Sequence, residues 1–330
     1  MGAYIARRFL YMVILLFLST IVSFAIIVLP PGDYLTSYVQ QLEAQGGEVT
    51  DDQIASLRAA YGLGDPEYVQ YIKWMRGMLT EGDLGRSFAW RAPVSEIILD
   101  RLPMTLVVSL GATILVYAVA IPVGIYSAVK QYSLGDYIAS FIGFIGLAMP
   151  NFLLGLILLM LFYNWFGISV GGLFSSDMQS APWSWDKFVD LLVHLPVPIL
   201  VLGLGGTAAI IRVMRATVLD ELQKPYVETA RAKGVSEWRL IMKYPVRVAL
   251  NPIVSTIGWL LPVILAGETI TAIVLNLPTI GPVLLQSLLT EDMFLASGIV
   301  LILTFLTIIG TFISDMALMW IDPRIRMVRS

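Results

Sequence analysis

Very few residues of this 330-residue chain could perform covalent or metal chemistry. His194 is the single histidine and there is no cysteine, which excludes disulfides, thiol catalysis, and metal sites built from cysteines or several histidines. His194 stands beside Pro196 and Pro198, where capping of a helix is the favoured role. No G-x-x-x-x-G-K-[ST] run occurs, so the chain has no P-loop for nucleotide phosphates. We therefore expect no catalytic centre, no metal and no cofactor bound by this chain.

A charged segment, residues 217–251, carries the most informative spacing. Tyr226–Lys233 is predicted to form a short helix, and Gly234 fits the position after it, where a residue without Cβ adopts the left-handed turn at little cost. Ser236 is a plausible N-cap of a second helix that runs to Tyr244. Such a helix–turn–helix is either a stiff lever for a partner protein or a hairpin whose basic face lies on anionic lipid.

Polar side chains inside apolar runs are the other candidates, because a charge at the bilayer centre costs roughly 2.5–3.5 kcal/mol. Glu268 either lines a pathway or lies near the outer interface, and Thr271 and Asn276 follow it. Pro150-Asn151 is expected to kink its run toward a pore or to have a purely structural role.

The elements that position these residues are predicted to be membrane helices. Hydrophobic residues make up 57% of the chain and charged residues 14%. About twenty apolar residues cross the roughly 30 Å hydrocarbon layer as a helix, and the alternation typical of a β-barrel is absent. The six apolar runs lie at approximately 9–29, 104–128, 138–163, 191–214, 253–275 and 295–320. The net charge of −3 does not suggest a nucleic-acid partner.

Lysine and arginine predict the orientation of these six spans. With the N-terminus inside, fourteen of the 21 basic residues fall on the inner side and seven on the outer side, six of them in the long first loop. Both termini are therefore expected to be cytoplasmic. The first run is too long for the apolar region of a signal peptide and no cleavage site follows it, so a retained span is expected.

The long polar segment after the first run, residues 31–101, is long enough for a small extramembrane domain. Glu67–Leu79 has a helical pattern. We expect residues 1–102 to form the first span with this domain, and residues 103–330 to form a five-helix core. The domain is either a platform for a binding protein, a pore cover, or a packed shield at the entrance.

The run Glu228-Thr-Ala-Arg-Ala-Lys-Gly234 resembles the EAA-x-x-x-G loop of binding-protein-dependent ABC importer permeases. The glutamate, the third-position alanine (Ala230) and the glycine match, whereas Thr229 replaces the middle alanine. The general I-x-L-P ending is not kept, and the run RVALNP, residues 247–252, is similar to the variant of the peptide-importer branch.

Four further segments resemble the B-type permease of that branch. They are GDLGRSF at residues 82–88, RLPMTL at 101–106, PNF at 150–152 and DPRIR at 322–326. Together with the EAA-like loop they occur in family order along nearly the whole chain.

The resemblance implies an all-α membrane protein with the type I ABC importer permease fold (MetI-like core). It implies that the chain forms half of a pathway for dipeptides or oligopeptides, with no ATPase site of its own. The implied partners are a second, C-type permease, two ATPase subunits that hold ATP and Mg²⁺, and an extracytoplasmic substrate-binding protein. In the family the loop docks into the ATPase subunit, which assigns coupling to Glu228, Ala230, Lys233 and Gly234. Asn151, Glu268, Thr271 and Asn276 are the candidate pathway-lining residues.

Two alternatives stay open at this stage. Peptide permeases typically carry a glutamate nearer the position of Ala272, whereas this chain has Glu268, so the same machine importing oligosaccharides is the runner-up. A different class of protein would be an ATP-independent secondary transporter, or a membrane anchor. The six-run count without a doubled half and the glycine-hinged loop argue against the transporter.

Overall fold

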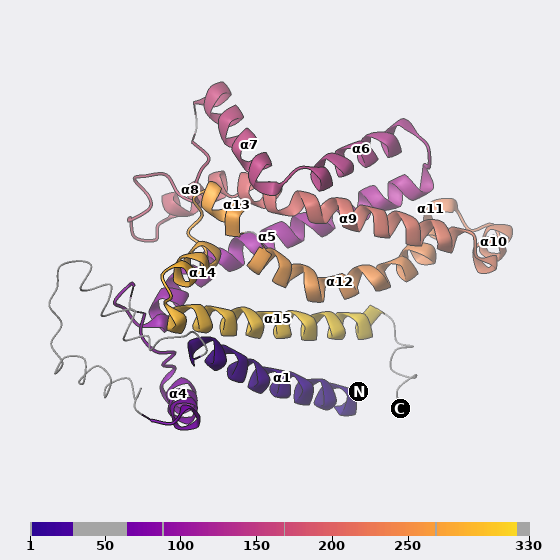
Figure 1. The fold of residues 1–330 in the computed structure, drawn as a ribbon. Helices are drawn as coiled ribbons and strands as arrows, with labels where there is room; N and C mark the ends of the chain where they lie inside the picture. Colours follow the sequence, from indigo (N-terminus) through magenta and orange to yellow (C-terminus); the bar gives the residue numbers. More distant parts are fainter. Residues whose placement is uncertain (1, 29–64, 88, 168, 268, 322–330) are drawn as a thin grey trace. The chain divides into compact units, whose positions relative to one another are not determined.

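Helices dominate the secondary structure of the chain. The computed structural model describes residues 2–28, 65–87, 89–167, 169–267 and 269–321, and Figure 1 labels its helices. Their bounds are α1 Gly2–Val28, α4 Glu67–Glu81, α5 Val94–Val129, α6 Leu134–Ala148, α7 Asn151–Phe166, α8 Trp185–His194, α9 Pro196–Leu222, α10 Pro225–Ala232, α11 Glu237–Lys243, α12 Pro245–Gly267, α13 Thr269–Val274, α14 Ile280–Leu289 and α15 Met293–Ile321. The all-α prediction is confirmed, and α4 confirms the expected helix at Glu67–Leu79.

Within the described residues, four helical stretches are long and apolar enough to cross a bilayer: α1, α5, α8 with α9, and α15. The bent pair α6–α7 makes a fifth if it counts as one span. The predicted run at 253–275 is divided between α12 and α13. A multi-spanning membrane protein is therefore confirmed, while the count of six spans is not.

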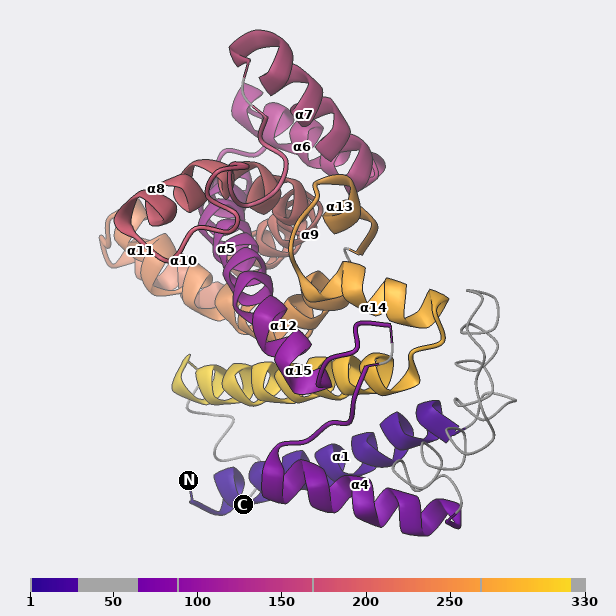
Figure 2. The same cartoon turned by 90° about the vertical axis from the view of Figure 1, so that its left-hand side faces the viewer.

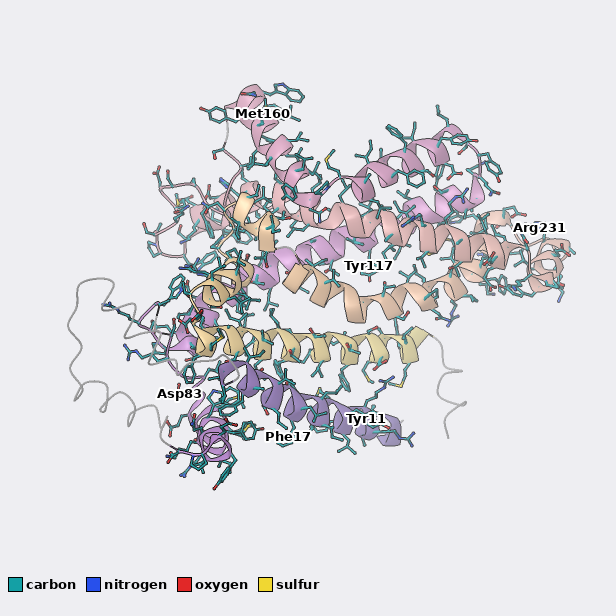
Figure 3. The ribbon with its side chains drawn as sticks, viewed as in Figure 1. Tyr11, Phe17, Asp83, Tyr117, Met160 and Arg231 are labelled. Atoms are coloured by element: carbon teal, nitrogen blue, oxygen red, sulfur yellow. The ribbon has the colours of Figure 1, made fainter. Side chains whose placement is uncertain are left out.

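Helix α1 has the exposure expected of a helix in lipid. Only 11% of its most apolar 18-residue stretch is buried, and large side chains such as Tyr11 and Phe17 are exposed along the helix (Figure 3). A helix that is apolar on all sides and has little protein around it needs hydrocarbon as its solvent.

The run at 138–163, expected as one span with a kink, forms two helices, and the chain bends by 107° between them. Proline lacks a backbone N–H and disfavours helical geometry in the residue before it. Accordingly, Met149 is extended (φ −90°, ψ 126°) between the end of α6 and Pro150. The expected kink is confirmed, and it is large enough to redirect the chain.

One compact unit contains Met104–Pro278 together with the part of α15 from Ile309 onward. Helix α9 lies at its centre, where it packs on α12, α6 and α7 (Figure 1), and Figure 2 shows the same helices turned by 90°. Glycine brings α5 and α9 close together, because a Cβ at Gly111 would lie 2.5 Å from Ile199 and one at Gly124 would lie 2.7 Å from Met214. Small residues are the usual means by which membrane helices approach closely.

Hydroxyl groups add polar links between the helices of this unit. Tyr117 on α5 and Thr256 on α12 share a hydrogen bond of 2.7 Å between their hydroxyl oxygens, and Figure 3 labels Tyr117. Ser314 on α15 donates to the carbonyl of Val254 on α12 at 2.8 Å. Thr311 donates to Gly258 O at 3.3 Å, at a close contact where Gly258 has no Cβ that would crowd Thr311.

The second compact unit contains Gly2–Pro103 and Thr279–Ile308. Asp292 is its central polar residue: it is 1% exposed and accepts hydrogen bonds from Ser87 Oγ at 2.5 Å and Ala89 N at 3.1 Å. Its other carboxylate oxygen accepts from Leu295 N at 3.2 Å and so caps the start of α15. Ser87 and Ala89 are thereby fixed to the α14–α15 junction.

The close contact of α5 and α9 gives the first prediction. Replacement of Gly124 by Val should destabilise the protein by about 1–3 kcal/mol, because a Cβ there would also lie 3.1 Å from the backbone oxygen of Ile211. Gly143→Ala is the matched control, since its Cβ would lie at an ordinary 3.6 Å from Ala208. Thermal unfolding in detergent measures both variants, and equal midpoints would contradict the close-packing account.

Candidate functional site

The candidate site is a helical hairpin, α10 with α11, between the end of α9 and the start of α12 (Figure 1). Pro225 begins α10 and Pro245 begins α12, which suits proline because its fixed φ matches the first helical position. The helices predicted over Tyr226–Lys233 and from Ser236 to Tyr244 are confirmed to within one residue at each end.

The turn between the two helices is a Schellman motif. Gly234 has φ +77°, its N–H donates to Arg231 O at 3.0 Å, and Val235 N donates to Ala230 O at 3.3 Å. No atom lies within 4 Å of a Cβ built at Gly234, so its backbone conformation alone favours glycine. Ser236 occupies the predicted N-cap position of α11, but its side chain makes no capping hydrogen bond.

The inner face of the hairpin is apolar and buried. Val227 and Leu240 are 0% exposed, and Ala230 and Ile241 are buried beside them. All four belong to the hydrophobic core of the α9-centred unit. The hairpin is therefore packed against the helices that flank it, and a force on it would be transmitted to α9 and α12.

An ion pair braces the outer face of the hairpin. Arg231 donates to both carboxylate oxygens of Glu237, from Nε at 2.5 Å and from Nη2 at 3.3 Å, and Figure 3 places Arg231 at the tip. This hydrogen bonding lowers the pKa of Glu237 and raises the pKa of Arg231. Both side chains are about half exposed, so their role is to hold α10 and α11 in register rather than to supply much stability.

Aromatic residues connect the hairpin to its neighbours. Tyr226 donates to the carboxylate of Glu221 at the end of α9, and its ring centroid lies 6.3 Å from that of Tyr244. Burial, assisted by the Glu221 carboxylate, raises the pKa of Tyr226 to about 12. Tyr226 therefore remains a neutral hydrogen-bond donor over the physiological pH range.

The predicted coupling residues occupy different environments. Glu228 and Lys233 are exposed on the outer face, whereas Ala230 faces the core and Gly234 forms the turn. Sequence reasoning missed Trp238, which is 70% exposed on α11. The available signal was its spacing, because residues two apart do not share a helix face and Trp238 therefore lies away from the apolar Leu240.

Three of the four candidate pathway residues lie in, or just after, α7 and α13, two helices that pack together. Asn151 is the first residue of α7, and Thr271 is buried in α13. Asn276 has φ +52° and donates from its N–H to Ile273 O at 3.0 Å, so it terminates α13 as Gly234 terminates α10. Glu268 lies outside the described residues.

The other polar candidates have structural partners. His194 Nδ1 lies 2.8 Å from Asp190 O and ends α8, in line with the predicted capping role. Within the described part of the chain, no cluster of three or more His, Cys, Asp or Glu residues could hold a metal ion. The described residues of the hairpin offer a mechanical contact surface.

Comparison with known proteins identifies the family. The family model for the binding-protein-dependent transport system inner membrane component matches residues 120–327, and the N-terminal model of the same system matches residues 1–110. The chain belongs to this family. It is therefore a membrane subunit of an ABC importer rather than an enzyme, and such importers work with ATPase subunits and a binding protein.

Several relatives match almost end to end. The oligopeptide transport system permease AppB of Bacillus subtilis is 36% identical over 326 residues, covering 98% of this chain and 99% of AppB. The dipeptide permease DppB of Escherichia coli K12 is 33% identical and covers 93% of this chain and 94% of DppB. These matches confirm the resemblance to B-type permeases of the peptide branch.

A solved structure supports the fold. The inward-facing MetNI methionine ABC transporter aligns with a TM-score of 0.53 at 15% identity, covering 68% of this chain and 96% of the other. The expected MetI-like fold therefore has a structural counterpart.

The turn at Gly234 gives the second prediction. Gly234→Val should leave membrane insertion intact but reduce substrate uptake about tenfold, because left-handed geometry costs a residue with Cβ roughly 1–2 kcal/mol. Gly234→Asn is the matched control, since Asn tolerates this conformation better. Uptake by cells with equal amounts of inserted protein measures the effect, and wild-type uptake by the Val variant would refute it.

The ion pair gives the third prediction. Because its folded-state pKa is lowered, Glu237 contributes stability above its ordinary pKa and loses that contribution as the pH falls through the lowered value. Arg231→Gln should return the pKa of Glu237 toward its ordinary value. Carboxyl NMR of labelled glutamate in lipid nanodiscs measures the titration, and an unchanged midpoint would show that the pair does not form.

Proposed function

We propose that this chain is the B-type permease subunit of an ABC importer of dipeptides or oligopeptides and forms half of its translocation pathway. The observation that carries the proposal is the rigid hairpin α10–α11, with its buried inner face and its exposed Glu228 and Lys233, in a chain that is 36% identical to an oligopeptide permease over nearly its whole length. The peptide cargo is inferred from the names of relatives such as AppB and DppB.

The proposed topology has six spans with both termini in the cytoplasm. Helix α12 supplies the span that the count of five leaves out, because its 23 residues at 1.5 Å per residue match the hydrocarbon thickness. Exposed aromatic residues at the end of α7 and the start of α8, among them Trp165 and Trp185, fit the outer membrane–water interface. The basic residues near the hairpin fit the cytoplasmic side.

In the proposed mechanism, two separate ATPase subunits bind ATP and Mg²⁺ and close against the hairpins of this chain and of a C-type permease. Glu228 and Lys233 contact the ATPase, Trp238 adds an apolar anchor, and Ala230 and Gly234 keep the hairpin rigid. Motion passes from the hairpin to α9 and α12. A substrate-binding protein delivers its load at the outer side, where Asn151, Glu268, Thr271 and Asn276 are proposed to border the pathway.

Site-specific photocrosslinking tests the docking of the hairpin, and this is the fourth prediction. A photoreactive residue in place of Glu228 or Trp238 should form a crosslink to a protein whose peptides contain a P-loop, identified by mass spectrometry. The same probe in place of Leu10 on α1, which is 55% exposed, should form none. Two results would contradict the proposal: the same crosslinked products from the α1 probe as from the hairpin probes, or no crosslink to a P-loop protein from either hairpin probe.

A further inference from the structure

An apolar groove lies between α5, α6 and α9, away from the coupling hairpin. Its volume is about 500 Å³, within the range of small-molecule sites. All of its lining residues belong to the α9-centred unit. They include Tyr126 of α5, Gly135 and Gly143 of α6, and Thr207, Ala208 and Ile211 of α9.

Small residues on α6 leave the groove open. A Cβ at Gly135 would clash with the hydroxyl of Tyr126, and one at Gly143 would only reach ordinary contact with Ala208. Thr207 donates its hydroxyl to Gly203 O at 2.9 Å, so this donor needs no hydrogen-bond acceptor from a ligand in the groove. An unbranched hydrocarbon chain therefore suits the lining better than a polar ligand.

One end of the groove is positively charged. Lys130 donates its N–H to Tyr126 O at 2.8 Å, which places it one turn beyond the groove on α5, and its side chain is exposed. Arg212 directly follows the lining residue Ile211 and is also exposed. Arg215 is held by Asp136, with Nη2 donating at 3.0 Å to one carboxylate oxygen and Nε donating at 3.2 Å to the other. Arg215 is thus paired with its own carboxylate, and Lys130 and Arg212 add two exposed cations close to this end of the groove.

We propose that this groove binds an anionic phospholipid, with an acyl chain along α6 and α9 and the headgroup phosphate near Lys130 and Arg212. Basic pockets between spanning helices on the cytoplasmic side bind anionic lipid headgroups. The inference rests on the proposed orientation, which puts this end in the cytoplasmic leaflet. The charge at one end distinguishes a phospholipid from a second apolar helix, which would not need it.

A photoreactive lipid tests the site. The full chain is reconstituted in phosphatidylcholine vesicles that contain a trace of phosphatidylglycerol or phosphatidylcholine with a diazirine in one acyl chain, and labelled peptides are mapped by mass spectrometry. Phosphatidylglycerol should label groove residues on the order of tenfold more than phosphatidylcholine does, because two cations add attraction at the surface. Equal labelling by the two lipids, or labelling spread evenly along α1, overturns the proposal.

Variants separate the headgroup contact from the acyl-chain contact. Lys130→Gln with Arg212→Gln should abolish the preference for phosphatidylglycerol, whereas Gly143→Leu, which fills the groove, should reduce labelling by both lipids. If Gly143→Leu fails to insert, the charge variants still decide. Preference that survives the charge variants contradicts the assignment.

The occupant of the groove and its leaflet are each tested separately. In the assembled importer the groove should still be labelled, and loss of label on assembly would show that the partner permease occupies it. Because the chain has no cysteine, a single Lys130→Cys variant reports the orientation through an impermeant thiol reagent. Exposure of that residue to the outer side would overturn the leaflet assignment. The lipid-labelling experiment contains no ATPase, so its failure would not count against the proposed importer function, which the crosslinking experiment tests.

Discussion

The structure depends on how closely helices can approach one another in a solvent that is as apolar as their side chains. Exchanging lipid contact for protein contact gains little hydrophobic free energy within a bilayer, so packing and interhelical hydrogen bonds must hold the bundle together. Helix α9 illustrates this constraint: Gly111 and Gly124 of α5, Gly146 of α6 and its own Gly203 all give up a side chain at its contacts. Hydroxyl groups that bond across the unit supply the polar links, as Ser314 does to Val254.

This tight packing explains how a small surface hairpin can act on distant helices. Val227 and Leu240 bury the hairpin in the same core that contains α9 and α12, and Tyr226 ties it to Glu221 at the end of α9. The bend at Pro150 redirects the chain, because it turns α7 away from the direction of α6. Alternating access proceeds largely as rigid-body motion of one part of a bundle against another, and a hairpin packed into the core suits the proposed transmission of such a motion.

Local chemistry was predictable from the sequence wherever one residue type dictates the geometry. Gly234 predicted the turn of the hairpin, and Pro150-Asn151 predicted a kink between α6 and α7. The size of the bend was not predictable, because tertiary contacts set it. The same applies to Asp292, which pairs with Ser87 across 205 residues of sequence. Residue type alone leaves two roles open at some positions: Asn276 is polar within an apolar run, and asparagine also tolerates the left-handed turn that ends α13. Ala230 matches a docking motif but faces the core, while Trp238, which no motif includes, is exposed. Burial decides between such roles, and burial is a property of the folded chain.

An external ATPase is proposed to drive transport through this chain. Peptide uptake into proteoliposomes measures it most directly, with the chain reconstituted alone or together with a C-type permease, two ATPase subunits and the binding protein. Uptake is expected only in the complete system with ATP and Mg²⁺. Uptake by the chain alone, driven by an ion gradient without any ATPase, would contradict it.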